Sequence, residues 1–333
     1  MGWSVLGHAW AVEMLRQQVA QGGLRHAYLF SGPGGVGRRT LALRFAQAIN
    51  CPQPVKPGLP CGICRVCRQI GEMQQPDLMV VQSDSEGETL KVNQVRELQR
   101  SLALAPYESA YRVALLLRFE EATHGAQNAL LKTLEEPNPR VVLLLTADEP
   151  ENLLPTVSSR CELLRLRPMP LDVLAEALAL QKGLAGEKAQ LIAHIAGGRP
   201  GYALRLAEDE SLLEARAEWL SDLFALLEAR QRERLAFSEM RTKGRERAEA
   251  RAGLRDGLAH WLSLWRDVLL SASGSGAPLT NLDYQERTTA LAGAVGETTA
   301  ARATMRLEHA FTRLANANLQ LMLDNLLLEW PRL

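Results

Sequence analysis

The segment that constrains the fold most is a short apolar run followed by a glycine-rich loop and an amphipathic stretch. Residues 27–31 read AYLFS, the loop reads GPGGVG, and the next residues, RRTLALRFAQAI, place apolar side chains at helical spacing. The order strand, loop, helix is typical of a phosphate-binding loop. Later apolar runs at residues 78–81, 113–117 and 141–145 are short and are separated by helical patterns. We therefore expect buried parallel strands joined by crossover helices.

The apolar pattern changes twice along the 333 residues, which predicts three domains. An α/β domain with a parallel sheet is expected in residues 1–167. Strand-like runs cease after Pro168, so residues 168–207 should form a small helical domain. Residues 208–333 are dominated by long amphipathic patterns rich in Ala, Leu, Glu and Arg, and should form an all-helical domain.

Charge and hydropathy exclude several classes of protein. Lys plus Arg and Asp plus Glu both count 38, so no global basic field attracts the chain to nucleic acid. The N-terminus lacks the pattern of a secretory signal, and no segment approaches 18 uninterrupted apolar residues. We expect a soluble cytoplasmic protein that does not enter a membrane.

The glycine loop lacks the side chains that phosphate chemistry requires. Gly32 and Gly37 bracket four residues, as in a Walker A loop. Arg38 stands where the phosphate-binding lysine belongs, and Arg39 stands where a hydroxyl should ligate magnesium. Hydrolysis is therefore not expected, while weak nucleotide binding and a simple strand-to-helix turn both stay open. The residues that would line a weak nucleotide site are Gly32, Gly35, Gly37 and Arg38.

A second element of an ATPase is also missing. A P-loop enzyme needs acidic residues at the end of a neighbouring strand, to hold magnesium and to prepare the attacking water. After residues 113–116 the sequence offers Leu117 and Arg118, and the nearest acids, Glu120 and Glu121, lie beyond the expected strand end. Two independent defects predict a protein that does not hydrolyse ATP.

Four cysteines form a cluster with nine, two and two intervening residues: Cys51, Cys61, Cys64 and Cys67. Thiolates at such short separations can close a tetrahedral zinc site, and four sulfur ligands leave no position for a reactive water. The alternatives are free cysteines and an iron–sulfur cluster, whose bacterial motif needs a further cysteine before a proline. Residues 68–71 contain none. We expect a structural zinc module over about residues 51–67.

Several motifs together resemble the bacterial clamp-loader AAA+ family. They are RHAYLFSGPGGVG, the cysteine cluster, NALLKTLEEP at residues 128–137 and SSRC at residues 158–161. The resemblance runs from His8 to about Gly201 and extends more weakly beyond. Members that hydrolyse ATP have the Walker lysine and acids, so their absence places this chain nearest the delta-prime branch. The resemblance implies an AAA+ P-loop domain with an inserted zinc module, a helical lid domain and an all-α collar domain.

The resemblance also implies partners and a role. It implies a heteropentameric clamp loader that belongs to DNA polymerase III and loads the sliding clamp on primed DNA. In such a loader, gamma or tau subunits hydrolyse ATP and a delta subunit opens the clamp. The arginine of the Ser-Arg-Cys motif, here Arg160, reaches the ATP of the next subunit as an arginine finger. Without the resemblance, bonds to nearby carbonyl groups are the better explanation of Arg160. Thr146 occupies a sensor position, although a helix cap explains it as well.

Two alternatives from other functional classes stay open at this stage. The first is an ATP-hydrolysing clamp-loader subunit with degenerate Walker motifs, which would use Arg38 in place of lysine and Glu120 or Glu121 as the acid. The second is a zinc-dependent nucleic-acid-binding module, which only the four cysteines suggest.

Overall fold

The chain separates into two compact units in the computed structural model. The described residues are 3–83, 89–244, 247–314 and 317–333. Unit 1 consists of Met1–Pro170 and Gly198–Tyr202, and unit 2 of Leu171–Gly197 and Ala203–Leu333. Within the described ranges, no helix combines the length and the apolar character that crossing a membrane requires. The three-domain division, with boundaries after residues 167 and 207, stays a prediction.

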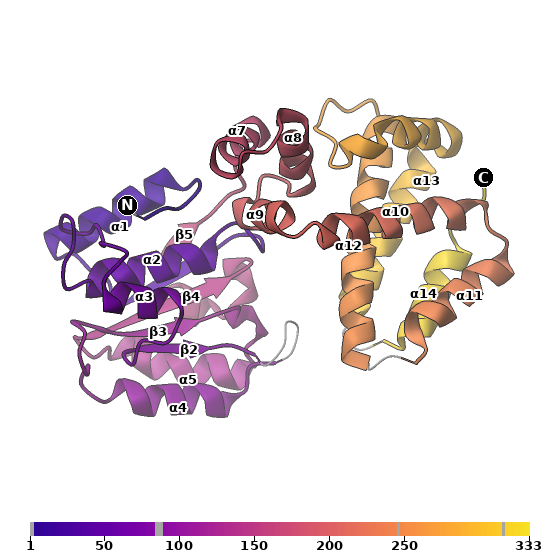
Figure 1. Cartoon of the computed structure of the whole chain (residues 1–333). Helices are drawn as coiled ribbons and strands as arrows, with labels where there is room; N and C mark the ends of the chain where they lie inside the picture. Colours follow the sequence, from indigo (N-terminus) through magenta and orange to yellow (C-terminus); the bar gives the residue numbers. More distant parts are fainter. Residues whose placement is uncertain (1–2, 84–88, 245–246, 315–316) are drawn as a thin grey trace. The chain divides into compact units, whose positions relative to one another are not determined.

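Unit 1 is built on a five-stranded parallel sheet in the order β2-β3-β4-β1-β5 (Figure 1). The strands are β1 (Ala27–Ser31), β2 (Leu78–Val81), β3 (Arg112–Leu116), β4 (Val141–Ala147) and β5 (Glu162–Arg165). Every residue of β1, β3 and β4 is buried. Burial on both faces explains why these strands are continuous apolar runs instead of alternating patterns. The predicted parallel sheet is confirmed.

Helices cover both faces of this sheet, because successive side chains of a strand point to opposite sides (Figure 1). Tyr28 and Phe30 pack with Phe45 on one side, and Leu29 packs with Leu130 on the other. The first face holds α1 (Ala9–Gln21), α2 (Arg38–Asn50) and α3 (Arg65–Gly71). The second face holds α4 (Val92–Leu102), α5 (His124–Glu135) and α6 (Pro155–Ser158).

The parallel arrangement gives the sheet two chemically different ends. The glycine loop follows β1 at the end where all strands finish, which we call the carboxyl end. Short 3-10 turns follow β3 and β4 on this side, at Phe119–Glu121 and Pro150–Asn152. Arg160 lies two residues before the start of β5, so it lies toward the opposite end, which we call the amino end.

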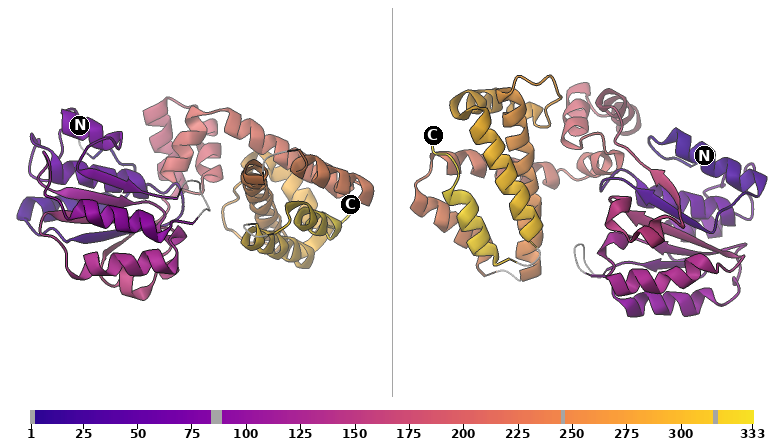
Figure 2. Two further views of the ribbon diagram at one scale, coloured as in Figure 1. Left: turned by 90° about the horizontal axis from the view of Figure 1, so that it is seen from below. Right: turned by 180° about the vertical axis from the view of Figure 1, so that it is seen from behind.

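Unit 2 is helical, and α12 and α13 lie side by side in it (Figure 2). Its apolar core includes four tryptophans, of which Trp261 and Trp265 are fully buried. The 29-residue α13 is interrupted at Gly296, where φ is 71°. The helices are α7 (Leu171–Lys182), α8 (Gly186–Ile195), α10 (Ser211–Glu228), α11 (Gln231–Thr242), α12 (Arg247–Ala272), α13 (Gln285–Arg313) and α14 (Leu319–Leu328), while α9 (Pro200–Glu208) has residues in both units.

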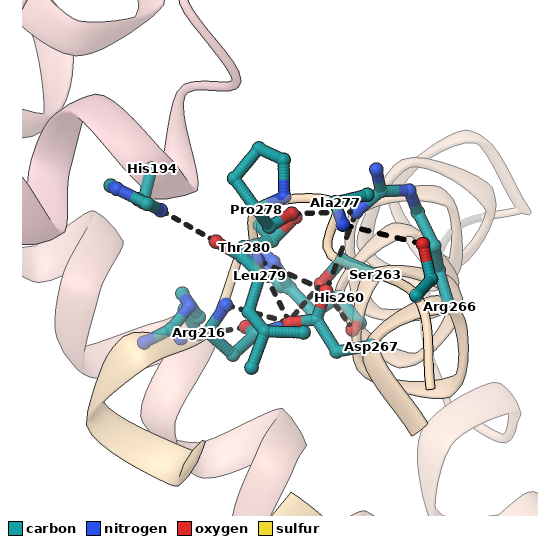
Figure 3. A network of polar contacts seen from close by, with 12 residues as sticks. His194, Arg216, His260, Ser263, Arg266, Asp267, Ala277, Pro278, Leu279 and Thr280 are labelled. Carbon is teal, nitrogen blue, oxygen red and sulfur yellow. Dashed lines mark hydrogen bonds and ion pairs between the residues drawn. The ribbon is translucent and has the colours of Figure 1, made fainter. Parts of the chain in front are cut away.

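A buried carboxylate fastens the loop between α12 and α13 (Figure 3). Asp267 is completely buried and accepts hydrogen bonds from the backbone N–H groups of Thr280 (2.9 Å) and Asn281 (2.7 Å). His194 of α8 lies 2.6 Å from the carbonyl oxygen of Leu279 in the same loop. The bonds to Asp267 compensate a charge whose burial alone would be costly. The contact of His194 connects α8 to the loop between α12 and α13.

Candidate functional site

Three glycines shape the loop between β1 and α2 at the carboxyl end of the sheet. The N–H of Gly32 donates to the carbonyl oxygen of Asp148 at 2.9 Å, and a Cβ on Gly32 would lie 2.2 Å from the carbonyl oxygen of Leu166. Gly32, Gly35 and Gly37 all have positive φ, of 139°, 83° and 113°. These positions therefore require glycine for local backbone reasons, whether or not the loop contacts a phosphate.

The chain itself covers part of this loop. The carbonyl oxygen of Gly35 accepts hydrogen bonds from the N–H groups of Gly201 (2.8 Å) and Tyr202 (3.3 Å). A Cβ on Gly35 would lie 2.9 Å from the Cβ of Tyr202, and one on Gly201 would lie 2.9 Å from the oxygen of Gly35. Arg199 adds a longer contact, of 3.4 Å, to the carbonyl oxygen of Gly34. The first residues of α9 thus pack directly on the glycine loop.

Arg38 is held by two acidic side chains. Its Nη2 lies 2.7 Å from Oδ1 of Asp148, and its Nη1 lies 3.9 Å from Oε1 of Glu120. The Arg38 side chain is only 11% exposed. Burial raises the pKa of Glu120, and the neighbouring charge of Asp148 acts in the same direction. Arg38 therefore pairs closely with the half-exposed Asp148 and lies near the largely buried Glu120, at the position expected for a Walker lysine.

The residues at the positions expected for the acidic pair and the sensor make other contacts. Leu117 is 4% exposed and offers no ligand atom. Arg118 adopts a left-handed conformation with φ of 49°, and its N–H donates to Oγ1 of Thr146 at 2.9 Å. The Arg118 side chain pairs with Glu121 at 3.0 Å. The hydroxyl of the buried Thr146 thus holds the backbone that follows β3.

The four clustered cysteines come together as predicted. Their Sγ atoms all lie within 4.8 Å of one another. The Sγ of Cys61 lies 3.6 Å from that of Cys51 and 4.0 Å from that of Cys67. Four sulfurs at 2.3 Å from one tetrahedral ion would be about 3.8 Å apart. The geometry fits a four-thiolate metal site.

The backbone around the cluster favours thiolates. The N–H groups of Cys61, Cys64 and Cys67 donate to the Sγ atoms of Cys51 (3.4 Å), Cys61 (3.3 Å) and Cys64 (3.4 Å). The backbone N–H groups of Cys64 and Ile63 lower the pKa of Cys61 to about 6. Burial acts in the opposite direction and raises the pKa of Cys67. A cation at the centre of the cluster would favour the deprotonated form of all four thiols.

Arg160 lies between α6 and β5, near the amino end of the sheet. Its Nη1 donates to the carbonyl oxygen of Thr156 at 2.8 Å, and its Nη2 pairs with Oε1 of Glu135 at 2.8 Å. The Arg160 side chain is 36% exposed. The next residue, Cys161, directs its thiol to the carbonyl oxygen of Val157, and burial raises its pKa to about 12. Arg160 is accessible, whereas Cys161 is an unreactive packing residue.

Comparison with known proteins identifies the family. The sequence model for the family described as DNA polymerase III, delta subunit, matches residues 7–170. DNA polymerase III subunit delta' of Bacillus subtilis is 30% identical over 258 residues, which cover 78% of this chain and 76% of that protein. This chain belongs to the delta-prime family of DNA polymerase III. The corresponding delta-prime protein of Pseudomonas aeruginosa is 36% identical over 207 residues, and this chain covers 61% of its length.

This delta-prime family member also resembles other DNA polymerase III proteins. The tau subunit of Escherichia coli is 32% identical over 209 residues, which cover 61% of this chain and 32% of that protein. A gamma subunit-related protein from Thermotoga maritima has a solved structure that covers 95% of this chain and 97% of its own, with a TM-score of 0.51 and 16% identity. At this identity, the likeness supports the fold alone.

Sequence patterns did not reveal the partners of the two arginines. Asp148, which pairs with Arg38, directly follows β4, and β4 neighbours β1 in the sheet. An acid one residue beyond a buried strand is a usable signal once the strand order is known, because the carboxyl ends of parallel strands meet. Glu135 lies 25 residues from Arg160 and is brought to it by the packing of α5 against α6, which no local pattern indicates.

Proposed function

We propose that this chain is the non-catalytic delta-prime subunit of a DNA polymerase III clamp loader, and that it supplies Arg160 as an arginine finger to a neighbouring ATPase subunit. The observation that carries the proposal is the placement of two arginines at opposite ends of one sheet. Arg38, at the chain's own loop, is buried among acids, whereas Arg160, at the other end, is accessible.

The chain's own loop is unsuited to hydrolysis. A P-loop ATPase uses a lysine, a hydroxyl and acidic residues around magnesium and the γ-phosphate. Here Arg38 is engaged by Asp148 and Glu120, and Leu117 has no ligand atom. The carbonyl oxygen of Gly35 also accepts hydrogen bonds from the first residues of α9, so the chain's own backbone covers this part of the loop.

The position of Arg160 favours action on another chain. β1 and β5 pair in parallel from Tyr28 with Glu162 to Ser31 with Arg165. At about 3.3 Å per residue, the strand alone separates its two ends by roughly 10 Å. Arg160 precedes the amino end of β5, while the glycine loop follows the carboxyl end of β1, so the guanidinium cannot reach its own loop. A cation exposed at this place can stabilise the charge of a transferring phosphoryl group on a neighbouring subunit.

The four cysteines are proposed to hold structural zinc. Cys51, Cys61, Cys64 and Cys67 would provide four thiolate ligands, and the ion would cross-link the segment between α2 and β2. The amide of Gln47 in α2 donates to the carbonyl oxygen of Cys67 at 2.6 Å, which connects the module to the helix behind the glycine loop. The module is proposed to stabilise unit 1 and not to activate water.

The proposed partners are gamma or tau subunits and a delta subunit in a heteropentamer, with the sliding clamp and primed DNA reached through the complex. This placement would put the protein in the cytoplasm. It is supported by the family membership and by the names of the related delta-prime and tau proteins.

The test is DNA- and clamp-stimulated ATP hydrolysis by a reconstituted loader with this chain or its Arg160→Ala variant. Size-exclusion chromatography checks that both loaders assemble. The proposal predicts a large fall in rate with assembly intact. An unchanged rate would refute the finger, and hydrolysis by the isolated chain that Arg38→Ala abolishes would instead support the alternative of a degenerate but active ATPase subunit.

A further inference from the structure

Two acids close α5 at a position where negative charge is unfavourable. Glu135 is the last residue of the helix and Glu136 caps it, so both belong to the end where helix carbonyl groups lack partners within the helix. The macrodipole disfavours anions at the C-terminus of a helix. An acid placed there needs a compensating interaction or another function. For Glu135 this interaction is the ion pair with Arg160, at 2.8 Å.

Both terminal nitrogens of the Arg160 guanidinium are engaged by neighbouring groups. Nη1 donates to the carbonyl oxygen of Thr156, in the single turn of α6, and Nη2 pairs with Glu135 at the end of α5. A freely rotating arginine samples many rotamers, and fixing it costs conformational entropy. Since one contact comes from each of two helices that pack together, the guanidinium has a defined location before any partner arrives.

We propose that Glu135 is a positioning residue for Arg160. The inference rests on the proposed finger function and adds a residue to it. Glu135 holds the guanidinium in a fixed direction at the amino end of the sheet, so that less entropy is lost when the finger meets a phosphoryl group. The Arg160 side chain is 36% exposed, and the remaining N–H groups of its guanidinium stay available for that contact.

A double-mutant cycle in the complete loader tests this role. Four loaders carry the wild-type chain, Glu135→Ala, Arg160→Ala or both changes, and kcat and KM for ATP are measured with primed DNA and clamp. Glu136→Ala is the matched control, because it removes the same charge from the next residue, which is exposed. Glu135→Asp is the conservative variant that should restore part of the contact.

The expected loss follows from the strength of exposed ion pairs. Glu135→Ala should lower kcat by about twofold to fivefold while KM for ATP stays unchanged, since such pairs contribute little when solvated. Glu136→Ala should have no effect, Glu135→Asp should recover part of the rate, and Glu135→Ala should add nothing once Arg160 is removed.

The contrary outcomes separate this inference from the proposed function. If Arg160→Ala itself leaves kcat unchanged, the proposed finger is wrong. If Arg160→Ala lowers kcat but Glu135→Ala matches its Glu136 control, or raises kcat, the finger stands and positioning by Glu135 is wrong. An equal loss from Glu135→Ala with and without Arg160 also overturns positioning, since the acid then acts elsewhere.

Discussion

The two ends of the sheet in unit 1 each present an arginine, and their surroundings differ. At the carboxyl end, Arg38 is 11% exposed and is held by Asp148 and Glu120. At the amino end, Arg160 is 36% exposed and is held by Glu135 and one carbonyl oxygen. The same side chain compensates buried charge in one place and stays accessible in the other. Residue type alone therefore does not assign a role, and the surrounding burial and charge do.

Under the proposed function, the comparison also explains how the fold of an ATPase can persist without ATP hydrolysis. The glycine loop keeps its backbone because Gly32 and Gly35 fit against Leu166 and Tyr202, and these are packing constraints. Under the proposed function, the catalytic side chains have no such constraint and are replaced. Packing would then preserve the shape of the carboxyl end without its chemistry, while Arg160 at the amino end would serve a neighbouring subunit.

The largest expected effect is a loss of stability of unit 1, which should affect both ends of the sheet alike. Cys67→Ser removes one proposed zinc ligand from a buried position, and structural zinc sites contribute apparent free energies of about 10–16 kcal/mol in small domains. We expect loss of the bound metal and a marked fall in the melting temperature, measured by elemental analysis and calorimetry. Cys161→Ser, outside the cluster, should keep the metal. Metal content that is equal in both variants would contradict the zinc assignment.

The next largest effect is a difference between the two arginine variants in the free energy of unfolding. Arg38→Ala leaves Glu120 buried without its cation, which should cost about 1–3 kcal/mol of the free energy of unfolding. Arg160→Ala changes an exposed residue and should cost less than about 0.5 kcal/mol. Urea unfolding of both variants measures the difference, with the exposed neighbour Arg39→Ala as control. Equal costs for Arg38 and Arg160 would remove the structural contrast between the two ends.

The smallest expected effect concerns the pH dependence of the carboxyl end. Burial raises the pKa of Glu120 in the fold, so the folded state binds this proton more tightly and loses stability as pH rises above the ordinary value of 4.5. Glu120→Gln should remove that loss and raise the free energy of unfolding near pH 7 by less than about 1 kcal/mol. The gain should vanish in acid, where Glu120 is protonated. A gain that is independent of pH would contradict this account of Glu120.

Local patterns predicted the scaffold better than the side-chain partners. The continuous apolar runs indicated β1 and β2 over the residues that form them. For β1 the reason is burial on both faces, which leaves no alternating pattern. The spacing of the cysteines likewise predicted their cluster. The ion pairs of Arg38 and Arg160 were not predicted, since they join elements that are distant in the sequence and depend on strand order and helix packing.

The measurement that tests the central claim most directly is ATP hydrolysis by assembled loaders that differ only at Arg160 or at Arg38. Arginine fingers contribute large factors, so Arg160→Ala should lower the DNA- and clamp-stimulated rate by at least about tenfold. Arg38→Ala should leave the rate per assembled complex within about twofold, because its loop contributes no chemistry in the proposed function. The opposite pattern, a rate lost with Arg38 and retained without Arg160, would show that the chain acts through its own nucleotide loop and would contradict the account.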